Sequence, residues 1–239
     1  MVNVFDKITD LTLLDNESNK VSLIGEFLGI EEEGLYNGKR SMVVLFKTNR
    51  DKNKPLYVWI GFEDNKTNTN FILDNLNKKV YIEGYLTVVP VFNDKAISHT
   101  FIVPEIIDIL SDEEVNGINN VNVSDFVTSY TVNNRVVLEG KIVGEVWKEF
   151  IEPVNNHVTR FQIEIDVNNK KRRIYCTVWD TVKDNEEVKT GIEVRIVGSY
   201  TMLKKERGLY YKNGYIIESR KNKLDSYVVI VQKINLLNK

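Results

Sequence analysis

Cations and aromatic side chains gather in several short stretches of this 239-residue sequence. The densest stretch places four cations and two tyrosines within nine residues: Lys204, Lys205, Arg207, Tyr210, Tyr211 and Lys212. A second stretch holds four consecutive cations, Lys170, Lys171, Arg172 and Arg173. Cations of this kind pair with phosphate groups, and aromatic faces accept stacked bases. The two stretches therefore predict contact with a polyanion that exposes its bases, and a solvated hairpin and a solvated turn are the alternative interpretations.

Strand alternation adds two aromatic side chains to this set. If Ile174, Cys176 and Val178 point into a core, Tyr175 and Trp179 point outward from the same strand. Two aromatic residues on the polar side of one strand are the sharpest indication of a binding site in the sequence. The alternative is that such residues pack under a loop or at a dimer contact.

Other candidates follow from the same alternation. Arg160 is expected to point outward from the neighbouring strand, and Tyr57 and Trp59 from a strand in the first half of the chain. Trp147, expected in the loop after a first strand, would border the same groove. These positions complete the predicted nucleic-acid site.

Enzyme chemistry finds little support in the sequence. There is no phosphate-binding Gly-Lys-Ser/Thr loop and no nucleophile elbow. The soft metal ligands, His99, His157 and Cys176, are scattered along the chain and match no zinc spacing. We therefore expect no catalytic activity, no metal and no cofactor.

Charge is distributed unevenly along a chain whose formal net charge is only −2. Residues 1–119 hold 12 Lys and Arg against 19 Asp and Glu, whereas the remainder holds 20 against 15. This asymmetry indicates that the C-terminal half binds the polyanion. The alternative is random variation in charge between two solvent-exposed surfaces. One cysteine and no signal-peptide pattern favour a cytoplasmic protein, and no apolar run is long enough to cross a membrane.

The two halves of the chain repeat one another at an offset of about 119 residues. Three pairs of segments match in the same order: 2–6 with 121–125, 20–25 with 135–140, and 80–84 with 194–198. Trp59 and Trp179 occupy comparable places between the second and third pairs. Their shared order predicts an internal duplication.

Each copy has the apolar pattern of about five strands. Period-two runs in the first copy occupy 21–27, 41–47, 56–60, 79–89 and 101–110. A short helix is expected at 70–76, between the third and fourth strands, and its counterpart at 181–190 is expected to be a turn or a short helix. This is the plan of the OB-fold, a five-stranded Greek-key barrel, whereas a Greek-key sandwich would need about seven strands. The expected fold class is all-β, with two tandem OB-fold domains and few short helices.

Glycines and a polar segment suggest how the barrels are built and separated. Gly25, Gly84, Gly140 and Gly198 lie inside strand patterns, where they would let one long strand coil and serve both sides of a small barrel. The acidic, Asn-rich segment 111–120 predicts a linker. We expect an N-terminal OB-fold domain at 1–112, a linker at 113–120 and a C-terminal OB-fold domain at 121–239.

The second copy resembles the bacterial single-stranded DNA-binding protein family, including its phage and plasmid members. The matching segments are 134–142, 159–163, 175–179, 189–198 and 228–236, and the first copy shows a fainter version over about 19–110. Lys141 and Glu26 stand where the family usually has an arginine after the first-strand glycine. The resemblance is to a tandem two-OB version without the acidic C-terminal tail, which favours an accessory, plasmid or phage type over the housekeeping replicative one.

The resemblance implies a protein that coats single-stranded DNA with little sequence preference, during replication, recombination or plasmid and phage DNA processing. Partners would be single-stranded DNA and replication or recombination proteins, not a membrane; homodimer and monomer stay open. An OB-fold adaptor between proteins of a DNA-processing complex and an RNA-binding protein are the alternatives. The charge split further predicts that the second copy dominates binding, with Tyr57 and Trp59 extending the track or forming an oligomer contact.

Overall fold

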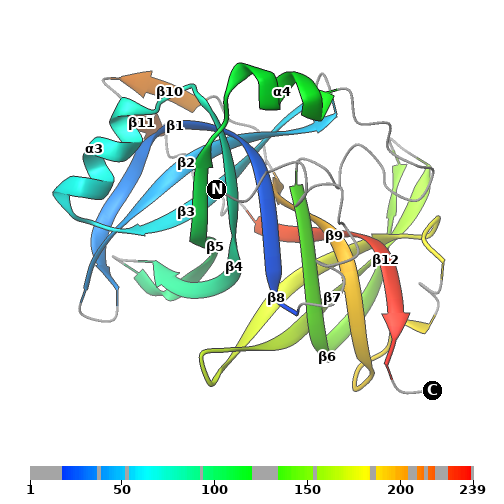
Figure 1. Cartoon of the computed structure of the whole chain (residues 1–239). Coiled ribbons are helices and arrows are strands. Elements are labelled where there is room, and N and C mark those ends of the chain that lie inside the picture. The colour runs from blue at the N-terminus through cyan, green and yellow to red at the C-terminus, as the bar shows by residue number, and fades with distance from the viewer. Residues whose placement is uncertain are drawn as a thin grey trace.

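The computed structural model describes residues 18–36, 39–51, 54–91, 94–119, 134–152, 155–183, 187–203, 209–212, 215–218 and 226–237. Strands make up most of these residues, and the all-β fold class is confirmed. Figure 1 shows two compact groups of strands side by side, one from each half of the chain. No helix in the described ranges is long and apolar enough to cross a membrane.

The N-terminal group of strands is a closed five-stranded barrel. Its strands are β1 (Lys20–Tyr36), β2 (Lys39–Asp51), β3 (Lys54–Glu63), β4 (Lys79–Val91) and β5 (Asp94–Ile109). The strand order is β2-β3-β5-β4-β1, and the pairing of β1 with β2 closes the barrel. β3 and β5 run parallel, with Ile60 opposite Ile102, as an OB-fold requires. The alternating side chains Val58 and Ile60 lie in the core with no exposed surface.

The C-terminal strands repeat the same order. They are β6 (Asn134–Ile151), β7 (Asn156–Val167), β8 (Lys170–Trp179), β9 (Glu193–Leu203) and β12 (Ser226–Leu236), arranged β6-β7-β8-β12-β9 and closed by β6–β9 pairing. Ile174, Cys176 and Val178 point into the core, as the alternation predicts. The strand order and closure of both barrels thus agree with a duplicated OB-fold.

Close backbone contacts explain the glycines inside the strands. Gly25 lies where β1 pairs with both β2 and β4, and Gly140 lies where β6 passes from β9 to β7. A Cβ atom at Gly140 would lie only 2.1 Å from the carbonyl oxygen of Glu164. Similar contacts occur at the other predicted positions, Gly25, Gly84 and Gly198. The glycines therefore admit a neighbouring strand where a long strand changes partners.

The two barrels share one continuous sheet. β1 pairs antiparallel with β6, so that Val21 lies opposite Val136 and Ser22 opposite Arg135. β1 also pairs with β4 over the same residues, and β6 pairs with β9. The main core is accordingly one connected cluster of buried apolar side chains drawn from both halves. Neither barrel is independent of the other in the described structure.

Two helices accompany the strands in the described residues. α3 (Lys66–Asp74) lies between β3 and β4, as expected, and begins earlier than the predicted 70–76 because the Asn65 side chain accepts a hydrogen bond from the Asn68 amide at 2.9 Å. α4 (Asp112–Asn119) occupies most of the segment predicted to be a linker. Within the described part of 181–190 there is a turn and no α-helix.

Candidate nucleic-acid interface

The outward side chains of β6, β7 and β8 form one surface, which we call the β6–β8 face. Cross-strand pairing places Trp147 opposite Arg160, and Arg160 opposite Thr177. Tyr175 and Trp179 lie two residues to either side of Thr177 on β8. The register therefore surrounds Arg160 with three of the predicted aromatic residues.

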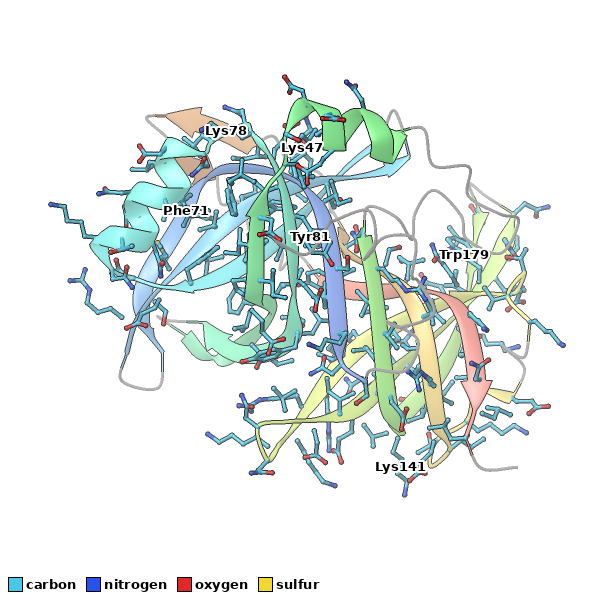
Figure 2. All side chains as sticks on the ribbon, viewed as in Figure 1. Lys47, Phe71, Lys78, Tyr81, Lys141 and Trp179 are labelled. Carbon is cyan, nitrogen blue, oxygen red and sulfur yellow. The ribbon has the colours of Figure 1, made fainter. Side chains whose placement is uncertain are left out.

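The aromatic side chains on this face differ in exposure. Tyr175 is 48% exposed and Trp147 is 39% exposed, whereas Trp179 is partly buried. Strand spacing puts the Cα atom of Trp147 about 12 Å from the Cα atoms of both Tyr175 and Trp179. In Figure 2, Trp179 lies at the opposite end of the C-terminal barrel from Lys141, which pairs with Glu164 at the other end of β7. The β6–β8 face therefore offers separated stacking surfaces along one side of the barrel.

Arg160, at the centre of the face, has an acidic partner. Its Nε donates to Oε2 of Glu149 at 2.7 Å. Glu149 lies on β6 two residues beyond Trp147, opposite Val158. Its side chain is 48% exposed, and that of Arg160 is 27% exposed. The guanidinium is therefore held in place among the aromatic rings by a carboxylate that reaches solvent.

A second carboxylate neutralises the cations nearer the β7–β8 turn. Glu164 accepts from Lys171 Nζ at 3.0 Å and from Arg173 Nε at 3.4 Å. The hydrogen bond from Lys171 is the main cause that holds the pKa of Glu164 below its usual range, and the same contact raises the pKa of Lys171. Arg173 and Glu164 lie opposite one another on the β6–β8 face. Much of the predicted positive charge is thus balanced within the sheet.

Two local predictions about these residues were wrong. Lys170, Lys171 and Arg172 were expected between two strands, but they begin β8, and the turn consists of Asn168 and Asn169, whose φ angles are 52° and 60°. Trp147 was expected in a loop, but it belongs to β6, which continues to Ile151. A long β6–β7 hairpin and a tight two-residue turn account for both differences.

Arg172 is separated from the other predicted cations. Alternation puts it on the opposite side of β8 from Arg173, opposite Ile165. Its Nε atom is buried and has no hydrogen-bond partner among the described residues. Arg172 is therefore placed away from the β6–β8 face, in contrast to Arg160 and Arg173.

Phe150, which like Trp147 was expected in a loop bordering the groove, forms an aromatic pair with His157, which was not among the predicted site residues. Their rings are 4.9 Å apart at an interplanar angle of 90°, and Phe150 is 50% exposed. They lie opposite each other near the tip of the β6–β7 hairpin, on the side away from Trp147 and Arg160. Continuing the alternation of β7 back to residue 157 would have found this pair.

The equivalent residues of the N-terminal barrel have different surroundings. Trp59 packs against Val43 and Phe101, with its ring 5.7 Å from that of Phe101. Val43 and Phe101 are only 3% and 6% exposed. Tyr57 and Trp59 do alternate with core residues, but strand β3 also contacts β9 of the C-terminal barrel. The structure therefore assigns Trp59 an apolar packing role on the outward side of β3.

The basic-aromatic stretch lies partly outside the described residues. Lys204, Lys205 and Arg207 fall there, whereas Tyr210, Tyr211 and Lys212 belong to β10 (Leu209–Lys212). β10 pairs with β11 (Tyr215–Glu218), and β11 pairs in parallel with β1, Tyr215 opposite Ile30. In Figure 1 this hairpin lies beside the N-terminal barrel. The backbone of this hairpin, which belongs to the C-terminal half of the chain, thus reaches the N-terminal barrel.

No family model matches the chain, and no curated protein matches its sequence. Solved structures share its fold. The single-stranded DNA binding protein from Thermus aquaticus is 14% identical, with a TM-score of 0.60 over 92% of this chain and 93% of that chain. A deletion mutant of that protein gives the same identity and TM-score over 92% of this chain and 95% of that chain. The likeness extends over both barrels and establishes that this chain has the OB-fold architecture of these proteins.

Proposed function

We propose that this protein binds single-stranded DNA on the β6–β8 face of its C-terminal barrel. The observation that supports the proposal best is the exposure of Tyr175 and Trp147 on either side of Arg160. Exposed aromatic rings stack on any base, and a cation between them can pair with the connecting phosphate. This combination favours binding of single strands with little sequence preference.

The fold supports the same function. Strands two and three of an OB-fold form the face on which oligonucleotides bind, and β7 and β8 hold these positions here. The structures with the same fold are named as single-stranded DNA binding proteins. Coating of single strands during replication or recombination is the cellular role that we infer from these points.

The proposed site also includes predicted residues whose side chains are not described. Lys204, Lys205 and Arg207 would supply further phosphate contacts. Tyr210, Tyr211 and Lys212 would offer stacking and phosphate contacts on β10, whose hairpin lies beside the N-terminal barrel. We propose domain limits of 1–112 and 121–239, with 113–120 between them. We further propose that the N-terminal barrel contributes mainly as a scaffold, because Trp59 is engaged with Val43 and Phe101.

A fluorescence titration tests the function. Oligo-dT, oligo-rU and duplex DNA are added to the full chain at two salt concentrations, and quenching of the three tryptophans is followed. We expect oligo-dT to bind far better than duplex, because a duplex hides the base faces. Equal affinity for duplex, or no binding at low salt, would contradict the proposal. Preference for oligo-rU would indicate an RNA-binding protein instead.

A further inference from the structure

Glu149 occupies the position at which a DNA phosphate would meet Arg160. The carboxylate oxygen Oε2 lies 2.7 Å from Arg160 Nε, and Glu149 follows Trp147 on the same side of β6. A phosphate oxygen and a carboxylate oxygen use the same donors of a guanidinium. The free protein thus presents its central cation with an anion already bound.

The two carboxylates of the face differ in how firmly they are held. Glu164 has two cationic partners, Lys171 and Arg173, and its side chain is only 17% exposed. Glu149 has a single ion-pair partner among the described residues, Arg160, and is 48% exposed. Exposed ion pairs contribute little to stability, so that Glu149 can leave Arg160 at small cost. Glu164 is expected to stay in place.

We propose that Glu149 is a displaceable internal anion that competes with the phosphates of single-stranded DNA for Arg160. This inference rests on the proposed function, since it requires a strand on the β6–β8 face. On binding, a phosphate takes the place of the carboxylate, and Glu149 turns toward water. The residue thereby weakens binding and favours a strand that is readily released.

Competition of this kind has a signature in the salt dependence. Each phosphate neutralised by a cation of the protein adds about 0.7 to the slope of log affinity against log salt for a single strand. In the native protein the contact to Arg160 adds little, because the displaced carboxylate restores a negative charge beside the strand. When the charge of Glu149 is removed, the contact between Arg160 and a phosphate contributes its whole increment to the salt slope.

The experiment compares Glu149→Gln with Glu145→Gln in the full chain. Glu145 is an exposed residue of the same strand, and no ion pair in the described structure involves it. Binding of oligo-dT is titrated over a series of salt concentrations. We expect E149Q to bind about fivefold more tightly, the order of one unit-charge interaction at 4 Å in water. Its salt slope should rise by about 0.7, and the slope of E145Q should stay at the native value.

A double-mutant cycle ties the effect to Arg160. In an Arg160→Gln background, adding Glu149→Gln should produce no rise in slope. Equal slopes for the E149Q and E145Q proteins, or a rise that persists without Arg160, would overturn the inference while native binding to oligo-dT stands. Absence of native binding at low salt would instead overturn the proposed function itself.

Discussion

The hydroxyl of Tyr200, on β9 of the C-terminal barrel, donates a hydrogen bond to the backbone carbonyl of Thr100, on β5 of the N-terminal barrel, at 2.5 Å. Tyr200 has no exposed surface, and burial raises the pKa of its hydroxyl. Asn134 fixes the backbone of Tyr200 by accepting from its amide at 2.9 Å and donating to its carbonyl at 2.6 Å. The contact joins the barrels in addition to the β1–β6 pairing.

Tyr200→Phe should therefore destabilise the whole chain. The substitution removes a donor from a buried carbonyl, which costs about 1–3 kcal/mol of unfolding free energy. Urea unfolding measures the change, and Tyr175→Phe serves as the control because its side chain is half exposed. An equal midpoint for the Y200F and native proteins would show that the bond contributes nothing to stability.

Gly25→Ala should be destabilising and Gly61→Ala nearly neutral. A Cβ at Gly25 would lie 2.1 Å from the carbonyl oxygen of Lys47, whereas the atoms nearest to one at Gly61 are 3.9 Å away. Moving the β2 backbone aside should cost about 1–3 kcal/mol or more. Both glycines belong to strands of the same barrel, so that urea unfolding compares them directly. Similar losses for the two variants would contradict this account of Gly25.

The duplication and the core of each barrel could be predicted from sequence, because alternation is a local signal. Ile174, Cys176 and Val178 are buried as expected. The length of β6 could not be predicted in the same way. No β6 residue beyond Val143 is fully buried, although Val146 packs against the core, and a bulge interrupts the pairing between Val143 and Trp147. A hairpin that projects from a barrel has no regular apolar alternation by which to recognise it.

Two further features depend on information that the prediction did not use. Ser111 and Glu114 form a reciprocal cap, with the Ser111 amide donating to the carboxylate at 2.8 Å. This Ser-x-x-Glu pattern could have revealed α4 within the expected linker. The pairing of Arg160 with Glu149, in contrast, follows from the register of β6 against β7. Composition alone therefore overstated the positive charge that the site presents.

Tyr175→Ala should weaken binding of oligo-dT by about 1–3 kcal/mol at every salt concentration, because stacking is not an ionic contact. Phe150→Ala is a matched control. Phe150 is equally exposed and aromatic, but it lies on the other side of the β6–β7 hairpin from Trp147. Fluorescence titration should therefore give a native affinity for F150A. Equal losses for the two variants would place the strand elsewhere on the barrel.

Glu164→Gln should reduce the loss of folding stability that occurs as the pH is lowered. Hydrogen bonds from Lys171 and Arg173 lower the pKa of Glu164 in the folded chain, so that the carboxylate contributes stability at pH values above its unfolded pKa of about 4.3. That contribution is lost as the pH falls through the lower, folded pKa. Between pH 7 and pH 3, the urea midpoint of the native protein should fall further than that of the E164Q protein. Glu145→Gln removes a charge from β6 that takes part in no ion pair within the described ranges, and it should follow the native curve. Parallel curves for the E164Q and native proteins would mean that Lys171 and Arg173 hold the carboxylate too weakly in solution to shift its protonation.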